Sequence, residues 1–349
     1  MRIAIVSDAW APQVNGVVRT LATTIDQLAA RGHAVERITP EGFRTFPCPS
    51  YPDIRLAISC KSEVARRLEQ AAPDAIHIAT EGPLGWAARR WCLDRGQPFT
   101  TSFHTRFPDY VAMRTGLPPA LFWPLFRRFH APAARIMVAT PSLAAELAGQ
   151  GLGQTHRWSR GVDLGLFSPA APRLAAMAGL RRPIQLYVGR VAIEKNITAF
   201  LDASVGGTKI VVGDGPARAQ LEQTYSGAHF LGALHGAELA SAYASADVFV
   251  FPSRTDTFGL VMVEALASGV PVAAFPVPGP RDVIGLDGCG RGGRPIGALD
   301  EDLGLAIERA LLLRRDACTT EGRLYTWKAC TDQFLAGLEA RARPIALAA

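Results

Sequence analysis

The sequence predicts an α/β protein with two domains, each built on a doubly wound parallel sheet. Its 349 residues suit two domains at about 150 residues per domain. Short apolar runs alternate with helical patterns along most of the chain, as they do in a series of strand–helix–strand units. Hydrophobic residues make up 48% of the chain and charged residues 19%, which excludes a disordered protein and supplies material for a core.

The first half is expected to form five parallel strands separated by helices. RIAIV at residues 2–6 is continuous and rich in β-branched side chains, as a strand buried on both faces should be. Residues 17–31 then repeat apolar side chains at helical spacing, and Gly32 is a typical residue to end that helix. The later strands are HAVERIT at 33–39, DAIHIA at 74–79, PFTTSF at 98–103 and RIMVAT at 135–140.

The second half repeats this architecture without repeating the sequence. Its expected strands lie at 183–189, 208–215, 229–232, 246–253 and 270–275, with helices around 196–204, 216–225, 236–245 and 258–268.

Residues 159–182 are rich in Gly, Pro and Ala and form the expected linker. The expected domains are therefore 1–165 and 166–330, and a C-terminal helix at about 331–349 could pack back on the first domain. Two Rossmann-like domains facing each other would place the carboxyl ends of both sets of strands on a central cleft, where open α/β sheets bind ligands.

The excess positive charge lies in the first half of the chain. The net charge is +6; residues 1–165 hold 19 Lys and Arg against 13 Asp and Glu, and the remainder holds 18 of each. Such a basic half is typical of a protein that meets phosphates, nucleic acid or an anionic membrane, although a generally Arg-rich composition also explains it. Because no nucleic-acid-binding module is recognisable, no nucleic-acid partner is expected.

The chain also lacks the patterns of a membrane-spanning or disulfide-rich protein. No apolar run reaches 18 residues, and the N-terminal apolar stretch is interrupted by Asp8. The six cysteines are far apart, which favours free thiols in a cytosolic protein.

The first of three segments that carry candidate chemistry is SDAWAPQVNGVVRTL at 7–21. It joins a strand to a helix, and Gly16 would let the backbone approach a ligand at a helix N-terminus that favours phosphate. A plain strand–helix turn is the alternative. In the second segment, GRVAIEKN at 189–196, Arg190 and Lys195 follow a strand end and could clamp a diphosphate. A solvated surface pair is the alternative there.

The third segment is SRTDTFGLVMVEALASG at 253–269. Phe258-Gly259 begins a helix whose backbone N–H groups suit an anion, and Asp256 stands just ahead of it as a ligand or, alternatively, as a helix cap. Glu264 lies in the apolar part of that helix and should have a partner, for which a ribose diol is a good candidate.

His104, at the end of a first-domain strand, is a further candidate, and a hydrogen-bonded loop histidine is its alternative. The other histidines are interpreted as structural: His33, His77, His130, His156, His229 and His235.

A metal is not expected. Asp300-Glu301-Asp302 contains an Asp-x-Asp pattern that can ligate metals, but it precedes a helical stretch and favours a helix cap. Arg190 and Lys195 would supply the positive charge that a metal otherwise provides, so no metal and no other cofactor is predicted.

These segments together resemble the retaining glycosyltransferases of family 4, which have the GT-B fold. The first loop, the Arg/Lys segment and the helix segment occur in the family's order, together with RGVDLGLFSP at 160–169 and VVGDGP at 211–216. The resemblance covers nearly the whole chain. The first Glu of the family's Glu-x7-Glu motif is Asp256 here, as is usual in a subgroup resembling sulfoquinovosyl-, glucuronosyl-, glucosyl- and mannosyl-lipid synthases.

The resemblance implies a role for each matching side chain. Arg190 and Lys195 would neutralise the diphosphate of the donor, and Glu264 would bind its ribose hydroxyls. Gly16 would let the first loop approach the donor, and His104 would contact the donor sugar near the reacting carbon.

The same resemblance assigns the donor sugar and the distal phosphate to Asp256 together with the backbone of Phe258, Gly259 and Leu260. It implies transfer of a glucosyl, glucuronosyl or mannosyl group, with retention, from a UDP- or GDP-sugar to a lipid such as diacylglycerol. A polysaccharide or soluble glycan acceptor, or a GT-B epimerase or hydrolase, remains the alternative. The first loop lacks G-x-G-x-x-G, which disfavours a dinucleotide-dependent oxidoreductase.

A membrane surface is a further expected partner. PPALFWPLFRRFHAPAAR at 118–135 places aromatic side chains beside arginines, as at the headgroup boundary of an anionic bilayer. Packing of the aromatic residues into the core is the alternative. The protein is accordingly expected to be cytoplasmic and peripheral on the inner face of the cell membrane. The candidate membrane and acceptor residues are Phe122, Trp123, Phe126, Arg127 and Arg128.

Overall fold

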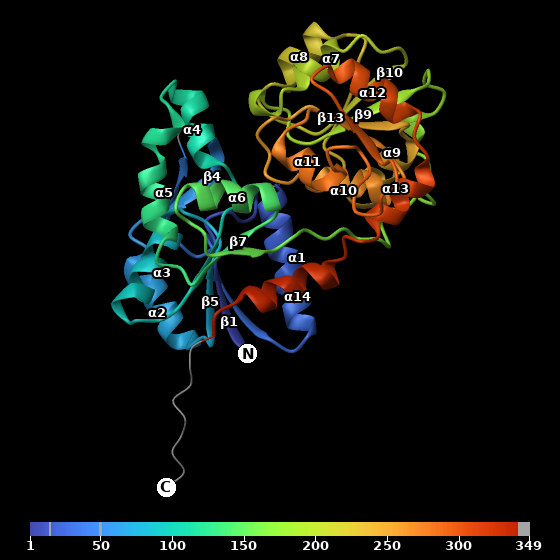
Figure 1. Cartoon of the computed structure of the whole chain (residues 1–349). Coiled ribbons are helices and arrows are strands. Elements are labelled where there is room, and N and C mark those ends of the chain that lie inside the picture. Colours follow the sequence, from blue (N-terminus) through green and yellow to red (C-terminus); the bar gives the residue numbers. More distant parts are fainter. Residues whose placement is uncertain (14, 49–50, 341–349) are drawn as a thin grey trace. The chain divides into compact units, whose positions relative to one another are not determined.

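The chain folds into two α/β units, which are described separately (Figure 1). The computed structural model describes residues 1–13, 15–48 and 51–340. The first unit comprises Met1–Ser159 and the chain from Cys330 onwards, and the second comprises Arg160–Ala329. The chain passes from the first unit to the second after Ser159, six residues before the boundary expected after residue 165. Of the expected C-terminal helix, residues 341–349 lie outside the described residues.

The first unit contains a six-stranded sheet in the order β2-β1-β5-β6-β7-β8, in which every neighbouring pair is parallel. Its strands are β1 (Arg2–Val6), β2 (Ala34–Ile38), β5 (Ala75–Ile78), β6 (Thr100–Ser102), β7 (Arg135–Val138) and β8 (Thr155–Arg157). The five predicted strands are confirmed. The sixth, β8, is a three-residue edge strand with half-buried side chains, too short and polar to show an apolar pattern.

Helices cover both faces of this sheet. They are α1 (Gly16–Ala30), α2 (Lys61–Ala71), α3 (Pro83–Asp94), α4 (Phe107–Thr115), η1 (Pro119–Leu121), α5 (Trp123–His130), α6 (Pro141–Gly149) and α14 (Trp327–Gly337). Figure 1 shows α2 and α3 on one side of the strands and α1 and α14 on the other. On the α14 side, the ring of Phe334 lies 5.0 Å from that of His77 in β5.

A two-stranded antiparallel hairpin, β3 (Thr45–Cys48) with β4 (Tyr51–Ala57), stands apart from the main sheet. It was not predicted. Each of its strands contains a proline, which removes a backbone donor and is found mainly on edge strands, so the segment has no clear strand pattern.

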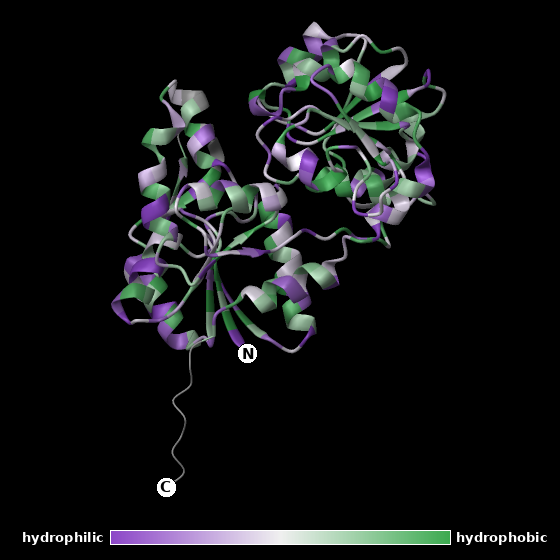
Figure 2. Ribbon diagram, in the orientation of Figure 1, coloured by the Kyte–Doolittle hydropathy of each residue, from purple (hydrophilic) through white to green (hydrophobic). Residues whose placement is uncertain are grey.

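The second unit has its own six-stranded parallel sheet in the order β11-β10-β9-β12-β13-β14. Its strands are β9 (Ile184–Val188), β10 (Thr208–Val212), β11 (His229–Gly232), β12 (Val248–Phe251), β13 (Val272–Ala274) and β14 (Gly297–Leu299). Every residue of β9 and β12 is buried, and Figure 2 shows the strands of this sheet largely in the hydrophobic colour. The predicted strands are confirmed, and β14 is a short additional edge strand.

The helices of the second unit are η2 (Ala175–Met177), η3 (Ile193–Lys195), α7 (Ile197–Asp202), α8 (Arg218–Thr224), α9 (Gly236–Ser245), α10 (Leu260–Ala267), α11 (Pro278–Ile284), α12 (Leu303–Leu311) and α13 (Arg315–Gly322). Four of them, α7 to α10, fall close to their predicted places, and the others had no predicted range. Asp302 caps α12, since its carboxylate accepts hydrogen bonds from two backbone N–H groups of the first turn. This confirms the prediction that the Asp-x-Asp segment caps a helix.

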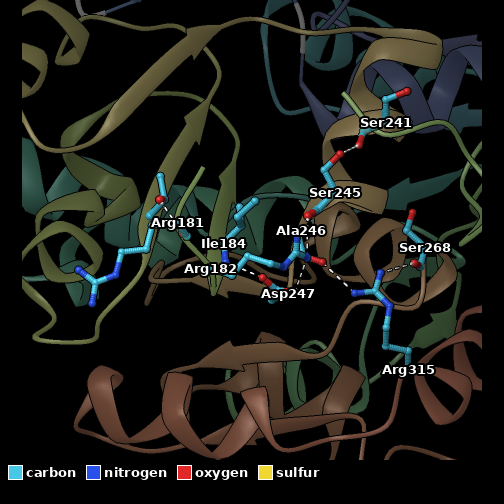
Figure 3. Close-up of polar contacts among 10 residues, drawn as sticks. Arg181, Arg182, Ile184, Ser241, Ser245, Ala246, Asp247, Ser268 and Arg315 are labelled. Atoms are coloured by element: carbon cyan, nitrogen blue, oxygen red, sulfur yellow. Dashed lines mark hydrogen bonds and ion pairs between the residues drawn. The ribbon is translucent and has the colours of Figure 1, made fainter. Parts of the chain in front are cut away.

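The segment predicted as a linker is fastened to the second unit at the edge where its strands begin (Figure 3). The backbone N–H of Leu174 donates to the Ser245 hydroxyl at 2.8 Å, and Arg182 forms an ion pair with Asp247 at 2.5 Å. Arg315 donates to two backbone carbonyls nearby, and burial lowers the pKa of its guanidinium. Most of this segment is therefore part of a folded unit.

Each sheet has one topological switch point, where the chain order reverses. In the first unit the chain leaves β1 for β2 and then returns to β5 on the other side of β1. In the second unit it leaves β9 for β10 and β11 and then returns to β12 on the other side of β9. Ligands of open α/β sheets bind outside the carboxyl ends of the strands at such points.

At the first switch point, the loops after β1 and β5 are joined through Asp8 and Thr80. The backbone N–H of Asp8 donates to the Thr80 hydroxyl at 2.7 Å, and that hydroxyl donates to the Asp8 carboxylate at 3.0 Å. The carboxylate also accepts from the backbone N–H groups of Leu84, at 2.9 Å, and Gly85, at 3.3 Å, in the first turn of α3. Asp8 therefore caps a helix that begins 75 residues later in the chain.

Trp123 and Phe126 belong to the core of the first unit, which corrects the expectation that they face a membrane. Each is only 8% exposed. The ring of Trp123 stacks on Phe103 at 5.9 Å, and Phe122 is partly buried against the same apolar cluster. The apolar sides of β6 and β7 need a covering helix, and the aromatic stripe of α5 provides it. Of the five predicted residues, Arg127 and Arg128 are exposed.

The buried Asp8 carboxylate makes a testable contribution to stability. Burial raises its pKa from 3.8 to about 6, despite the hydrogen bonds that lower it. Because the folded-state pKa is raised, the stabilisation is fully present below the unfolded-state pKa and is lost as the pH rises through 6. A shift of about two pKa units corresponds to roughly 3 kcal/mol.

We therefore expect wild type to lose roughly 3 kcal/mol of stability relative to Asp8→Asn between pH 3.5 and pH 7. The free energy of unfolding is measured by urea titration at several pH values. Asp26→Asn, at an exposed position of α1, is the matched control. A wild-type-minus-variant difference that stays constant with pH would show that folding does not shift the pKa of this carboxyl.

Candidate functional site

The second switch point brings together two residues that the sequence analysis selected independently. Lys195 lies in η3, in the loop after β9, and Asp256 lies in the loop after β12. The Lys195 ammonium donates to the Asp256 carboxylate at 2.6 Å, and each side chain is 20% exposed. The two loops thus meet through a partly buried ion pair that sequence spacing alone does not predict.

Two further contacts hold these loops together. The side-chain amide of Asn196 donates to the carbonyl of Pro252 at 3.2 Å, and the Thr255 hydroxyl lies 3.5 Å from the carbonyl of Glu194. The loops that carry the candidate residues for binding diphosphate and sugar are consequently held together by contacts within the chain.

Arg190 stands at the start of the β9 loop and is half-buried. Its carbonyl accepts a hydrogen bond from the Tyr187 hydroxyl at 2.8 Å, which fixes the backbone where the strand ends. The loop thus places Arg190 and Lys195 five residues apart on one side of the switch point. Two cations in this position suit an anionic ligand with several oxygens.

The helix after Asp256 begins as expected, with Leu260 as its first residue and Gly259 as its N-cap. Gly259 has φ +86°, and an added Cβ would lie 2.9 Å from the ring of Phe251, so glycine is required there. The side chain of Phe258 is buried against Tyr325, with the ring centroids 6.1 Å apart. Asp256 is not the helix cap, which removes the alternative considered for it.

Glu264 is completely buried in α10, and its partner is the Tyr243 hydroxyl of α9, which donates to the carboxylate at 3.0 Å. The prediction that this carboxylate needs a partner is therefore confirmed, although the sequence did not identify Tyr243. Its predicted contact with a ribose diol stays a prediction. Ribose could reach the carboxylate only if the side chains that cover it move.

In the first unit, Gly16 lies at the end of the loop after β1 and His104 directly follows β6, and β5 stands between these two strands. Gly16 is the first residue of α1, and an added Cβ would meet no described atom within 4 Å, so the space beside it is open. His104 follows β6, is 8% exposed, and lies edge-on to Trp158 at 5.5 Å. Their predicted contacts with a donor sugar remain predictions.

The sequence analysis missed the polar residues of the first switch point. Asp8 is visible in the sequence only as a polar residue that ends an apolar strand, and Thr80 and Glu81 follow the next inner strand in the same way. A polar residue at the end of a buried parallel strand was the available signal.

Within residues 1–13, 15–48 and 51–340, no group of three or more His, Cys, Asp or Glu side chains is arranged to hold a metal ion. The six cysteines are free thiols, as predicted. Among the described helices, none combines the length and hydropathy needed to cross a bilayer.

Comparison with known proteins identifies both halves of the chain. Residues 14–166 match the model of Glycosyltransferase Family 4, and residues 182–294 match that of Glycosyl transferases group 1. The chain is 34% identical to a GDP-mannose-dependent alpha-mannosyltransferase of Mycobacterium tuberculosis, with 81% of each protein covered. It is 31% identical to a sulfoquinovosyl transferase of Arabidopsis thaliana, over 84% of this chain and 62% of the relative.

A third relative is the alpha-monoglucosyldiacylglycerol synthase of Streptococcus pneumoniae, which is 28% identical over 90% of this chain and 79% of the relative. Among solved structures, the chain resembles a sucrose-phosphate synthase of Thermosynechococcus elongatus with a TM-score of 0.74, at 23% identity over 96% and 97% of the two chains. Together with the two parallel-sheet units, these similarities show that the chain belongs to glycosyltransferase family 4 and is a hexosyltransferase with the GT-B fold.

Proposed function

We propose that this enzyme transfers a glucosyl, glucuronosyl or mannosyl group from a UDP- or GDP-sugar to a lipid acceptor such as diacylglycerol. The observation that carries the proposal is the meeting of Lys195 and Asp256 at the β9/β12 switch point, beside Arg190. The names of the relatives, which include a mannosyltransferase, a sulfoquinovosyl transferase and a monoglucosyldiacylglycerol synthase, support this range of sugars and a lipid acceptor.

Arg190 and Lys195 neutralise the diphosphate of the donor in this proposal. Lys195 exchanges its partner Asp256 for a phosphate oxygen, and its interaction strengthens as negative charge develops on the leaving group. A charge-assisted hydrogen bond of this kind is worth roughly 1.5–3 kcal/mol. The two cations supply the positive charge that the departing diphosphate requires, so the reaction is proposed to need no metal.

Release from Lys195 lets the Asp256 carboxylate accept hydrogen bonds from hydroxyls of the donor sugar. The backbone N–H groups around Phe258, Gly259 and Leu260 lie at the start of α10, where the helix dipole favours the distal phosphate. Glu264 takes the ribose hydroxyls. Gly16 and His104 are the proposed contributions of the first unit to donor-sugar binding.

Retention of configuration is proposed to result from departure and attack on the same face of the sugar. In this proposal the released Asp256 holds hydroxyls of the donor sugar, and Glu264 is hydrogen-bonded by Tyr243, so neither of these two carboxylates is assigned the role of a covalent nucleophile. The leaving diphosphate then takes the proton of the attacking acceptor hydroxyl.

A panel of nucleotide sugars tests the proposed function. Purified enzyme is incubated with UDP-glucose, UDP-glucuronate or GDP-mannose, with and without a lipid extract, and the products are identified by mass spectrometry. We expect a glycolipid from one donor, in the absence of added metal, and at least a tenfold lower rate for Lys195→Ala, or about 1.4 kcal/mol of transition-state stabilisation.

Glu238→Gln, an exposed position on α9, is the control and should retain the wild-type rate. Free sugar or an epimerised donor without acceptor would identify a hydrolase or epimerase instead. Transfer only to soluble glycans would exclude the lipid acceptor.

A surface on the first unit supports attachment to an anionic membrane. Leu121 is 62% exposed, and Leu125 of α5 is 55% exposed. Arg127 and Arg128 are further exposed residues of the same helix. Apolar side chains beside arginines suit the boundary between headgroups and acyl chains. We propose that these four residues, in place of the buried aromatic ones, contact the inner face of the cell membrane.

Sedimentation with liposomes checks this surface. Binding should increase with the anionic lipid fraction and decrease with salt, because basic residues near such a surface contribute roughly 1 kcal/mol each. Arg127→Ser with Arg128→Ser should therefore weaken binding about 30-fold. Leu312→Ser changes an 85% exposed leucine of the second unit and should have no effect. Equal sedimentation of all variants would exclude this face as the membrane contact.

A further inference from the structure

Glu81 is a nearly buried carboxylate at the first switch point, directly after Thr80. Its side chain is 9% exposed, and Oε1 lies 3.1 Å from Nε2 of His130, the last residue of α5. The His130 side chain is completely buried, and its Nδ1 lies 2.9 Å from the hydroxyl of Thr101 in β6. Three elements of the first unit thus hold one carboxylate in place.

One arrangement of protons satisfies all these contacts with a neutral imidazole. Thr101 donates its hydroxyl hydrogen to Nδ1, and the N–H at Nε2 donates to the Glu81 carboxylate. The imidazole ring is packed against Phe103 and Phe129, with ring centroids 5.7 and 5.0 Å away. The carboxylate is therefore oriented by a side chain that is itself fixed.

The hydrogen bond from His130 occupies only one of the acceptor sites of the Glu81 carboxylate. A carboxylate has two oxygens and about four acceptor sites. Among the described residues, His130 is the only hydrogen-bond partner of this carboxylate. Burying a carboxylate with a single hydrogen-bond partner is costly, which makes Glu81 a candidate for contact with a ligand.

A purely structural role for Glu81 as a helix cap does not fit the contacts. The N-cap of α3 is Gly82, which has no side chain to make a cap bond, and the first backbone N–H groups of that helix are taken by Asp8. Asp8 accepts three hydrogen bonds in doing so. Glu81, with one accepted hydrogen bond against three for Asp8, thus has the greater acceptor capacity left at this switch point.

The position of Glu81 in the sheet places it among the candidate catalytic loops. β5 lies between β1 and β6. The loop after β1 leads to Gly16, and the loop after β6 carries His104. Since the carboxyl ends of parallel strands meet at one edge, Glu81 lies between the segments expected to contact the donor sugar.

We propose that Glu81 binds a hydroxyl group of the acceptor, with His130 as its positioning residue, and that the acceptor group seated at the first switch point is therefore uncharged and bears one or more hydroxyls. This inference rests on the proposed transferase function and deepens it. A carboxylate accepts hydrogen bonds from hydroxyls, whereas a phosphate ester beside Glu81 and Asp8 would meet like charge in a low dielectric. Glycerol or a hexose fits this chemistry.

Steady-state kinetics with separate variation of donor and acceptor tests the assignment. In Glu81→Gln we expect kcat/KM for the acceptor to fall about tenfold or more, as for loss of a charge-assisted hydrogen bond, with an unchanged KM for the nucleotide sugar. Glu81→Asp keeps the negative charge on a side chain that is one methylene shorter, so it should show the same loss of kcat/KM for the acceptor. Glu69→Gln, on the exposed surface of α2, is the matched control. Near-UV circular dichroism and thermal melting confirm folding.

His130 is tested by a pair of variants. His130→Leu removes the donor to Glu81 and should reproduce the acceptor defect, whereas His130→Gln retains a side-chain N–H and should restore most of the acceptor kcat/KM. An equal loss of acceptor kcat/KM in His130→Leu and His130→Gln, or a raised KM for the donor, would assign His130 a structural role. Either result would overturn the proposal that His130 positions Glu81.

The acceptor panel contains diacylglycerol and monohexosyldiacylglycerol as neutral lipids, phosphatidylglycerol and phosphatidylinositol as anionic ones, and a neutral oligosaccharide. We expect wild type to prefer neutral acceptors and Glu81→Gln to lose part of that preference. A preference for anionic lipids, or an acceptor KM independent of Glu81, would overturn this inference alone. Transfer only to the oligosaccharide would overturn the proposal of a lipid acceptor. The role of Glu81 would then be judged by comparing the KM for the oligosaccharide in wild type and Glu81→Gln. No transfer to any acceptor would overturn both.

Discussion

The ion pair between Lys195 and Asp256 is the interaction on which the site of the second unit depends. It joins the loops after β9 and β12 across the switch point and pairs two partly buried charges. A lone charge at this depth would be costly, because neither solvent nor another group would fully compensate it. A diphosphate can take over Lys195 because it offers more negative charge than one carboxylate. We propose that binding of the donor then makes Asp256 available to sugar hydroxyls.

The two units use the same place in a parallel sheet for different chemistry. In the second unit the switch point is lined by Arg190 and Lys195, which suit a diphosphate. In the first unit it is lined by Asp8, Thr80 and Glu81, which suit hydroxyl groups. The chemical difference follows from which side chains end β1, β5, β9 and β12, since the strand order is equivalent at the two points. The three polar residues of the first switch point therefore do not share the basic character of the first half of the chain.

Local patterns predicted most of the fold, whereas contacts between distant residues could not be predicted. Short runs rich in apolar or β-branched residues located the ten expected strands, most clearly β1, β9 and β12, because inner parallel strands are buried on both faces. The short edge strands β8 and β14 and the proline-containing hairpin carry no such pattern. The aromatic residues of α5 were misassigned because aromatic side chains beside arginines look alike at a membrane and on an amphipathic helix. The partners of Glu264 and Lys195 depend on tertiary structure, so the sequence indicated only that Glu264 needed one.

Calorimetric titration of UDP and GDP tests most directly whether the second switch point is the donor site and whether Asp256 competes for Lys195. The account predicts that Asp256→Asn binds the preferred nucleoside diphosphate more tightly than wild type, by about fivefold if the partly buried pair is worth about 1 kcal/mol. It predicts weaker binding by Glu264→Gln, with Glu238→Gln unchanged. Weaker or equal binding by Asp256→Asn, together with unchanged binding by Glu264→Gln, would contradict the assignment of the donor to this point of the sheet.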